Sequence, residues 1–149
     1  MSETVNRLNG GRRTSRAAVA IGAGLVLQLL TIAAVLLATG AIEEHLRGVY
    51  AQYRPDQAER AGGIVVTYLL VVGVLGAAGW LLTAWAHRRR TRWTRVLAWT
   101  FLVLGTLLAV TNLAITEYGS RLVPLWLGVA GLVPSLAGLA AVTLLHRER

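Results

Sequence analysis

Three histidines and seven acidic residues are the side chains of this 149-residue chain best suited to acid–base or metal chemistry, because the chain has no cysteine. His87 and His146 directly follow long apolar runs, whereas His45 lies in a separate polar segment. A zinc site needs three or four ligands, and a haem inside a bundle needs facing histidines within the helices. No Ser-His-Asp set or phosphate-binding loop is recognisable. The sequence therefore predicts a protein that is not an enzyme and has no metal or cofactor.

A second group of polar residues lies within the apolar runs and comprises Gln28, Tyr68, Asn112 and Ser135. Amide and hydroxyl groups at such depth either hydrogen-bond neighbouring helices or contact a neutral solute. Gln28 and Ser135 fall near the middle of their runs at a rise of about 1.5 Å per residue. We expect Gln28 to bond Ser135 or the Ala130 carbonyl, which loses its usual donor because residue 134 is proline.

The elements that position these residues are four runs without a charged residue or histidine: 17–42, 61–86, 96–116 and 122–145. Each run is long enough to cross about 30 Å of hydrocarbon as a helix. Hydrophobic residues make up 55% of the chain and charged residues 15%, and the polar segments are too short to cover four buried helices. The prediction is an all-α integral membrane protein, with four transmembrane helices in an antiparallel bundle forming a single domain over residues 1–149.

Arginine is distributed unevenly around these runs. It is concentrated in the N-terminal tail, the connection after the second run and the C-terminal tail: Arg7, Arg12, Arg13, Arg16, Arg88, Arg89, Arg90, Arg92, Arg95, Arg147 and Arg149. These three segments share one side of a four-span chain, so the positive-inside rule predicts that both termini are cytosolic. Every basic residue is arginine, which is typical of a GC-rich bacterial gene, and we expect the cell (inner) membrane as the location.

The connection at residues 88–95 is the most basic segment of the chain. Basic residues beside a span gain about 1 kcal/mol each near an anionic leaflet. Reading a nucleic acid would also require a folded element that enters a groove, which so short a loop lacks. We therefore expect anionic membrane lipid at residues 88–95, and no nucleic-acid partner.

The external segment at residues 43–60 shows helical periodicity. Leu46, Val49, Tyr50 and Tyr53 fall at i, i+3, i+4 and i+7, which predicts one apolar helical face at the outer interface. This segment is interpreted either as a lid over the bundle or as a docking site for an external ligand or partner.

Small residues indicate where helices can approach closely. Gly73 with Ala77, and Gly131 with Ser135, have small-xxx-small spacing in the second and fourth runs. Such faces pack either within the chain or against a second protomer, so the sequence is compatible with both a monomer and a homo-oligomer.

In length and number of spans the chain resembles the small multidrug transporters, a family that relies on a membrane-embedded glutamate in the first helix. At the corresponding depth this chain has Gln28, which argues against proton coupling. In architecture it also looks like other small four-span proteins of GC-rich bacteria. We expect a non-catalytic accessory, regulatory or scaffolding component that binds a larger membrane protein. The alternative is an oligomeric transporter or channel for a neutral or apolar solute, with Gln28, Asn112 and Tyr68 along its path.

Overall fold

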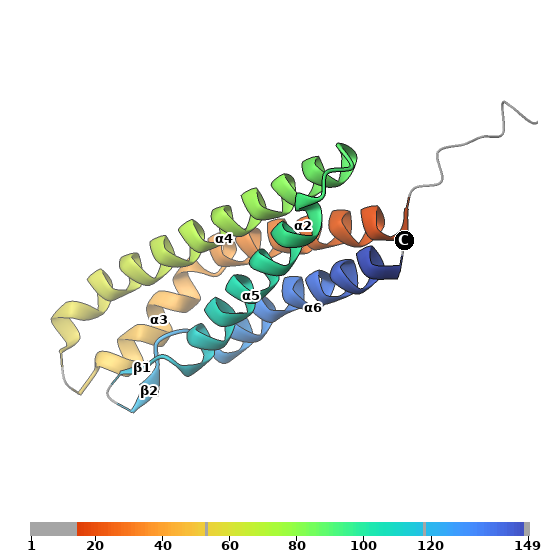
Figure 1. Cartoon of the computed structure of the whole chain (residues 1–149). Helices are drawn as coiled ribbons and strands as arrows, with labels where there is room; N and C mark the ends of the chain where they lie inside the picture. Colours follow the sequence, from red (N-terminus) through yellow and green to blue (C-terminus); the bar gives the residue numbers. More distant parts are fainter. Residues whose placement is uncertain (1–14, 53, 118, 148–149) are drawn as a thin grey trace, which may run out of the picture.

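The computed structural model describes residues 15–52, 54–117 and 119–147, and these residues fold almost wholly into helices (Figure 1). Four helices are long and apolar enough to span a membrane: α2 (Arg16–Leu37), α4 (Ala58–Arg88), α5 (Trp93–Ala114) and α6 (Leu125–Arg147). The expectation of an all-α protein with four candidate transmembrane helices is confirmed.

Shorter elements connect the long helices. The amphipathic helix α3 (Thr39–Tyr50) and the 3-10 turn η1 (Pro55–Gln57) join α2 to α4. Between α5 and α6, β1 (Thr116–Glu117) pairs antiparallel with β2 (Ser120–Arg121). Gly119 closes this hairpin at φ 78, a left-handed conformation that glycine adopts without a steric penalty.

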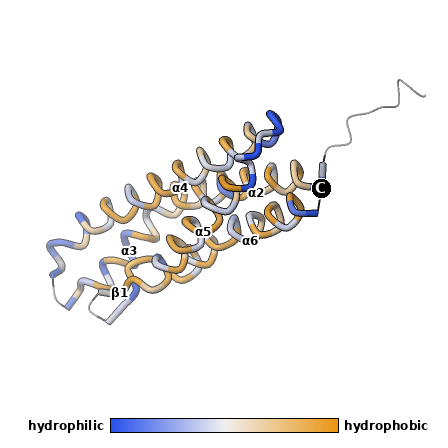
Figure 2. The backbone as a smooth tube through the Cα atoms, viewed as in Figure 1, coloured by the Kyte–Doolittle hydropathy of each residue, from blue (hydrophilic) through white to orange (hydrophobic). Residues whose placement is uncertain are grey.

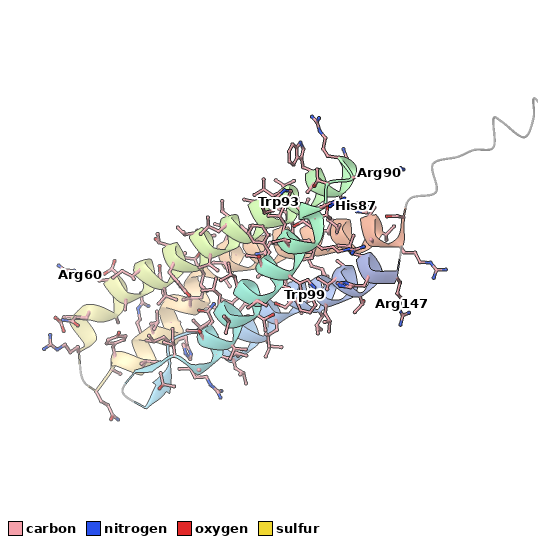
Figure 3. All side chains as sticks on the ribbon, in the orientation of Figure 1. Arg60, His87, Arg90, Trp93, Trp99 and Arg147 are labelled. Atoms are coloured by element: carbon pink, nitrogen blue, oxygen red, sulfur yellow. The ribbon has the colours of Figure 1, made fainter. Side chains whose placement is uncertain are left out.

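Polar and charged residues gather at the two ends of the bundle, and the middle is apolar (Figure 2). We call one end the arginine end: it holds the start of α2, the end of α6 and the connection between α4 and α5 at residues 89–92. Arg90 and Arg147 lie there, whereas Arg60 lies at the opposite end (Figure 3). That opposite end, which carries α3 and the β1–β2 pair, is the hairpin end.

The first apolar run is interrupted at Ala38, where α2 ends and α3 begins one residue later. The Thr39 hydroxyl donates to the carbonyls of Leu36 (2.9 Å) and Val35 (3.3 Å). Such side-chain bonds compete with the helical ladder and bend helices, and Gly40 further weakens helix formation here. The structure thus places the end of the first long helix before residue 42.

The four long helices are arranged in a ring. α2 packs against α4 and α6, and α5 also packs against α4 and α6, so α2 and α5 face each other across the centre. A Cβ at Gly73 would lie 2.7 Å from Ile32 Cγ1 of α2, whereas a Cβ at Gly131 would meet nothing within 4 Å. The small face of α4 therefore packs on α2, and Gly131 borders open space.

A buried apolar cluster lies towards each end of the ring. The hairpin-end cluster joins α3 to the long helices and consists of Val35, Ile42, Leu46, Val49, Tyr50, Ala58, Val123 and Leu127. The arginine-end cluster consists of Ala17, Ala98, Val142 and Leu145. The apolar face of α3 is buried within the protein, which corrects the expectation that it faces the outer interface; Tyr53 lies outside the described residues.

Candidate functional site: a cavity inside the bundle

The centre of the ring contains a cavity of about 260 Å³ whose wall comes from all four long helices. Three of the polar residues singled out in the sequence, Gln28, Asn112 and Ser135, lie in this wall.

Gln28 reaches from α2 towards α4. Its Nε2 donates to the carbonyl oxygen of Gly73 over 3.3 Å. A Cβ at Gly76 would lie 2.9 Å from the Gln28 Cδ, so glycine at that position makes room for the amide. The expected partners on α6, Ser135 or the Ala130 carbonyl, are therefore corrected to Gly73.

The reason lies in the order of the helices around the ring. The depth of Gln28 along its helix follows from the sequence. Which helix its side chain meets depends on the order of the helices around the ring. The Gln28 side of α2 faces the glycine-rich side of α4, and a carbonyl there is accessible because Gly73 and Gly76 have no side chain.

Tyr68 and Asn112 form the second polar contact between helices. The Tyr68 hydroxyl of α4 donates to Oδ1 of Asn112 on α5 over 3.0 Å. Asn112 belongs to the cavity wall, and Tyr68 bonds it from α4. Each of these two hydrogen bonds thus joins neighbouring helices of the ring.

Trp80 is the largest side chain of the cavity wall, and it was not among the residues singled out from the sequence. Its ring extends from α4 to α2, where a Cβ at Gly24 would overlap it. It also reaches α6, where a Cβ at Gly138 would lie 3.8 Å from the Trp80 ring. The available signal was the spacing of glycines at positions 73, 76 and 79 directly before Trp80.

The cavity wall shares residues with both buried clusters. Val35, Val123 and Leu127 belong both to its wall and to the hairpin-end cluster. At the other end, Ala98 belongs both to its wall and to the arginine-end cluster. The cavity therefore meets packed apolar side chains at both ends.

A second cleft, which we call the basic cleft, lies at the arginine end. It is lined by residues of the α4–α5 connection and its neighbours: His87, Arg90, Thr91, Arg92, Thr94, Arg95 and Leu145. The connection ends α4 with backbone bonds from Arg90 N to the His87 carbonyl (3.1 Å) and from Thr91 N to the Ala86 carbonyl (3.2 Å). This is the Schellman pattern, whose left-handed position usually holds glycine.

Here that position holds Arg90, at φ 51. A side chain in this region costs of order 1 kcal/mol or more. The sequence thus keeps a cation at a position where glycine would relieve the strain, and the cation lies in the wall of the basic cleft.

The three histidines occupy separate places and each has a hydrogen-bond partner. His87 Nε2 lies 3.0 Å from the hydroxyl of Ser15, which also accepts from the Ala18 amide and caps α2. His45 donates to the carbonyl of Arg121 over 2.7 Å. His146 bonds the backbone of its own helix. Within the described ranges, no three His, Asp or Glu side chains gather in a group that could hold a metal ion.

Comparison of this chain with known protein families, with curated proteins and with solved structures finds no match.

Proposed function

We propose that this chain is a small multi-pass inner-membrane protein without catalytic machinery, which acts as an accessory, regulatory or scaffolding component of the membrane. The observation that carries the proposal is that the wall of the central cavity merges with a buried apolar cluster towards each end of the bundle. A component that works by binding needs a stable bundle but no path through it. The internal hydrogen bonds of Gln28 and Tyr68 fit the same role, since they join helices of the ring.

The proposed orientation is an antiparallel bundle with the arginine end, and so both termini, in the cytosol. The support is the positive-inside rule applied to the basic residues of the α4–α5 connection. Trp85 and Trp93 flank this connection and are exposed, as aromatic side chains at headgroup depth would be. Single cysteines at Gln52, Ser120 and Thr91 test the orientation in intact cells. A membrane-impermeant thiol reagent should label positions 52 and 120 and spare 91; the reverse pattern would invert the topology.

The proposed partners are a larger membrane protein or further copies of this chain, together with anionic lipid at the basic cleft. Large apolar side chains are exposed on all four long helices, so lipid or protein covers each of them. Arg90, Arg92 and Arg95 line the cleft, which suits a phosphate headgroup better than a neutral one.

The accessory role is tested by crosslinking the tagged full chain in its native membrane before purification. We expect one larger membrane protein in constant ratio to this chain, and the reciprocal purification should return this chain. Recovery of the chain with itself alone, combined with solute flux in liposomes, would contradict the role.

The lipid proposal is tested by thermal unfolding in detergent with added phosphatidylglycerol. Ligands that bind the folded state raise its melting temperature. We expect a rise for the unaltered chain and a smaller one for Arg90→Gln with Arg95→Gln. Arg121→Gln, at the hairpin end, is the control and should keep the full rise. An equal rise in all three proteins would refute specific binding at the cleft.

A transporter or channel for a neutral or apolar solute is the second candidate. The position of Gln28 and Asn112 in the cavity wall favours it, because their amides would face a solute there. It requires opening of both clusters in turn. Flux that stops when Gln28 is replaced by leucine, with the fold intact, would move this candidate ahead of the accessory role.

A further inference from the structure

Four residues of the cavity wall are exposed: Leu75 of α4, and Leu104, Gly105 and Leu108 of α5. Because all four belong to α4 and α5, the cavity opens sideways between these two helices. The three leucines are 62%, 50% and 38% exposed, respectively. All wall residues contributed by α2 and α6 are buried or half-buried. We call the opening marked by these four residues the portal.

Two contacts between α4 and α5 frame the portal along the helices. Towards the hairpin end, the Tyr68 hydroxyl bonds Asn112. Towards the arginine end, a Cβ at Gly79 would lie 2.6 Å from Phe101 Cδ1, so the two helices meet closely there. Among the neighbouring pairs of the ring, α4 and α5 share the least contact. The portal is therefore the gap between α4 and α5 that lies between these two contacts.

The portal lies at the depth of the hydrocarbon core. Leu75 is close to the middle of α4 (Ala58–Arg88), and Leu104 is close to the middle of α5 (Trp93–Ala114). If these helices span a bilayer, the portal faces acyl chains and is remote from both headgroup regions. Water has no direct route to it.

The chemistry of the portal and cavity suits an apolar guest. Leucine and glycine form the mouth, and a Cβ at Gly105 would meet nothing within 4 Å, so the mouth is not blocked there. Inside, the Gln28 amide already donates to Gly73, and Asn112 already accepts from Tyr68. An apolar protein cavity of about 150 Å³ stays dry and takes up a benzene-sized molecule, and this one is larger at about 260 Å³.

We propose that the cavity binds an acyl chain of a membrane phospholipid, which enters sideways through the portal between α4 and α5. The bilayer presents such chains at the mouth at all times. The bound chain fills the space between Trp80 and Gly131 and replaces packing that the glycines of the wall do not provide. This inference goes beyond the accessory role and does not depend on the identity of any protein partner.

Fluorescence quenching of Trp80 by brominated lipid tests the proposal in the full chain. The other four tryptophans, Trp85, Trp93, Trp99 and Trp126, are exposed and are replaced by phenylalanine. The single-tryptophan protein is reconstituted at low density in phosphatidylcholine vesicles with bromine at mid-chain. We expect strong quenching, although the Trp80 ring lies between α2 and α6.

Two substitutions identify the source of the quenching. Gly131→Leu places a side chain in the cavity and should reduce quenching at least two-fold, with Gly131→Val giving a smaller reduction if leucine impairs folding. Gly22→Leu is the matched control, because Gly22 lies on the exposed side of α2, where a Cβ meets nothing within 4 Å. Circular dichroism checks that each variant is folded.

Two results would overturn the proposal. Quenching unchanged by Gly131→Leu would show that the bromines act from outside the bundle. Quenching by acrylamide from the aqueous phase would show a water-filled cavity. Because the test uses the purified chain alone, its failure leaves the accessory role untouched.

Discussion

Replacing Gly24 by alanine should destabilise the bundle, because the Trp80 ring occupies the space that a Cβ at Gly24 would need. Gly22, on the same helix, has nothing within 4 Å of such a Cβ. Alanine favours a helix over glycine by about 1 kcal/mol at either site, so this gain cancels when the two variants are compared. What remains is the cost of overpacking, typically about 1–3 kcal/mol.

The Trp80 ring also lies beside Gly138 of α6, so a Cβ at Gly24 has to displace the ring from this packing into the cavity that it lines. We therefore expect Gly24→Ala to be less stable than Gly22→Ala by roughly 1–3 kcal/mol. The measurement is reversible unfolding in mixed micelles of a mild detergent and SDS, followed by circular dichroism. Gly22→Ala serves as the reference for helix propensity.

A double-mutant cycle isolates the contact. In a Trp80→Phe background the smaller ring leaves room, so Gly24→Ala should cost less than half of what it costs beside tryptophan. Equal stability of Gly24→Ala and Gly22→Ala, or an equal cost of Gly24→Ala in both backgrounds, would refute the packing of α2 on α4 described above.

The polar contacts and the cap of α2 give three further expectations. Gln28→Leu should lower the free energy of unfolding by about 0.6 kcal/mol, with a ceiling near 1.7. Gln28→Glu should lower it more, because a carboxylate is costly at that depth. Unfolding of both variants in SDS measures the two differences. Tyr68→Phe and Asn112→Leu should each cost a similar ~0.6 kcal/mol, and the double variant no more than either alone, since both remove one bond; strict additivity would contradict this. Ser15→Ala should cost about 1 kcal/mol through loss of the N-cap, read as fraying of the start of α2 by hydrogen exchange, and unchanged exchange there would count against the cap.

The four long helices were predictable because charge is so strongly excluded from their runs. Each run crosses a membrane only as a helix, so length and composition suffice to find it. The break at Ala38 was not visible in the same way, because Thr39 and Gly40 are ordinary residues of an apolar run and act through local hydrogen bonding. The periodicity of α3 was correctly recognised as amphipathic, but an apolar face looks the same whether lipid or protein covers it.

The cavity was beyond prediction from the sequence for a different reason. Its existence depends on whether a side chain of a neighbouring helix occupies the space beside each glycine. The space beside Gly73 is taken by Ile32, whereas the space beside Gly131 stays open. Both belong to the same kind of small-residue pattern, so only the order of helices around the ring separates packing from open volume. The partner of Gln28 was missed for the same reason, because it too depends on the order of the helices around the ring.

The ring also imposes an order of assembly. The first long helix, α2, makes its most extensive contact with the last, α6. At about 5–20 residues per second, the ribosome needs roughly 5–20 s to synthesise the chain between Leu37 and Leu125. During that time the side of α2 that will meet α6 has no partner within the chain. A copy that terminates before Leu125 never gains that partner, so an incomplete copy differs from a complete one by the uncovered side of its first long helix.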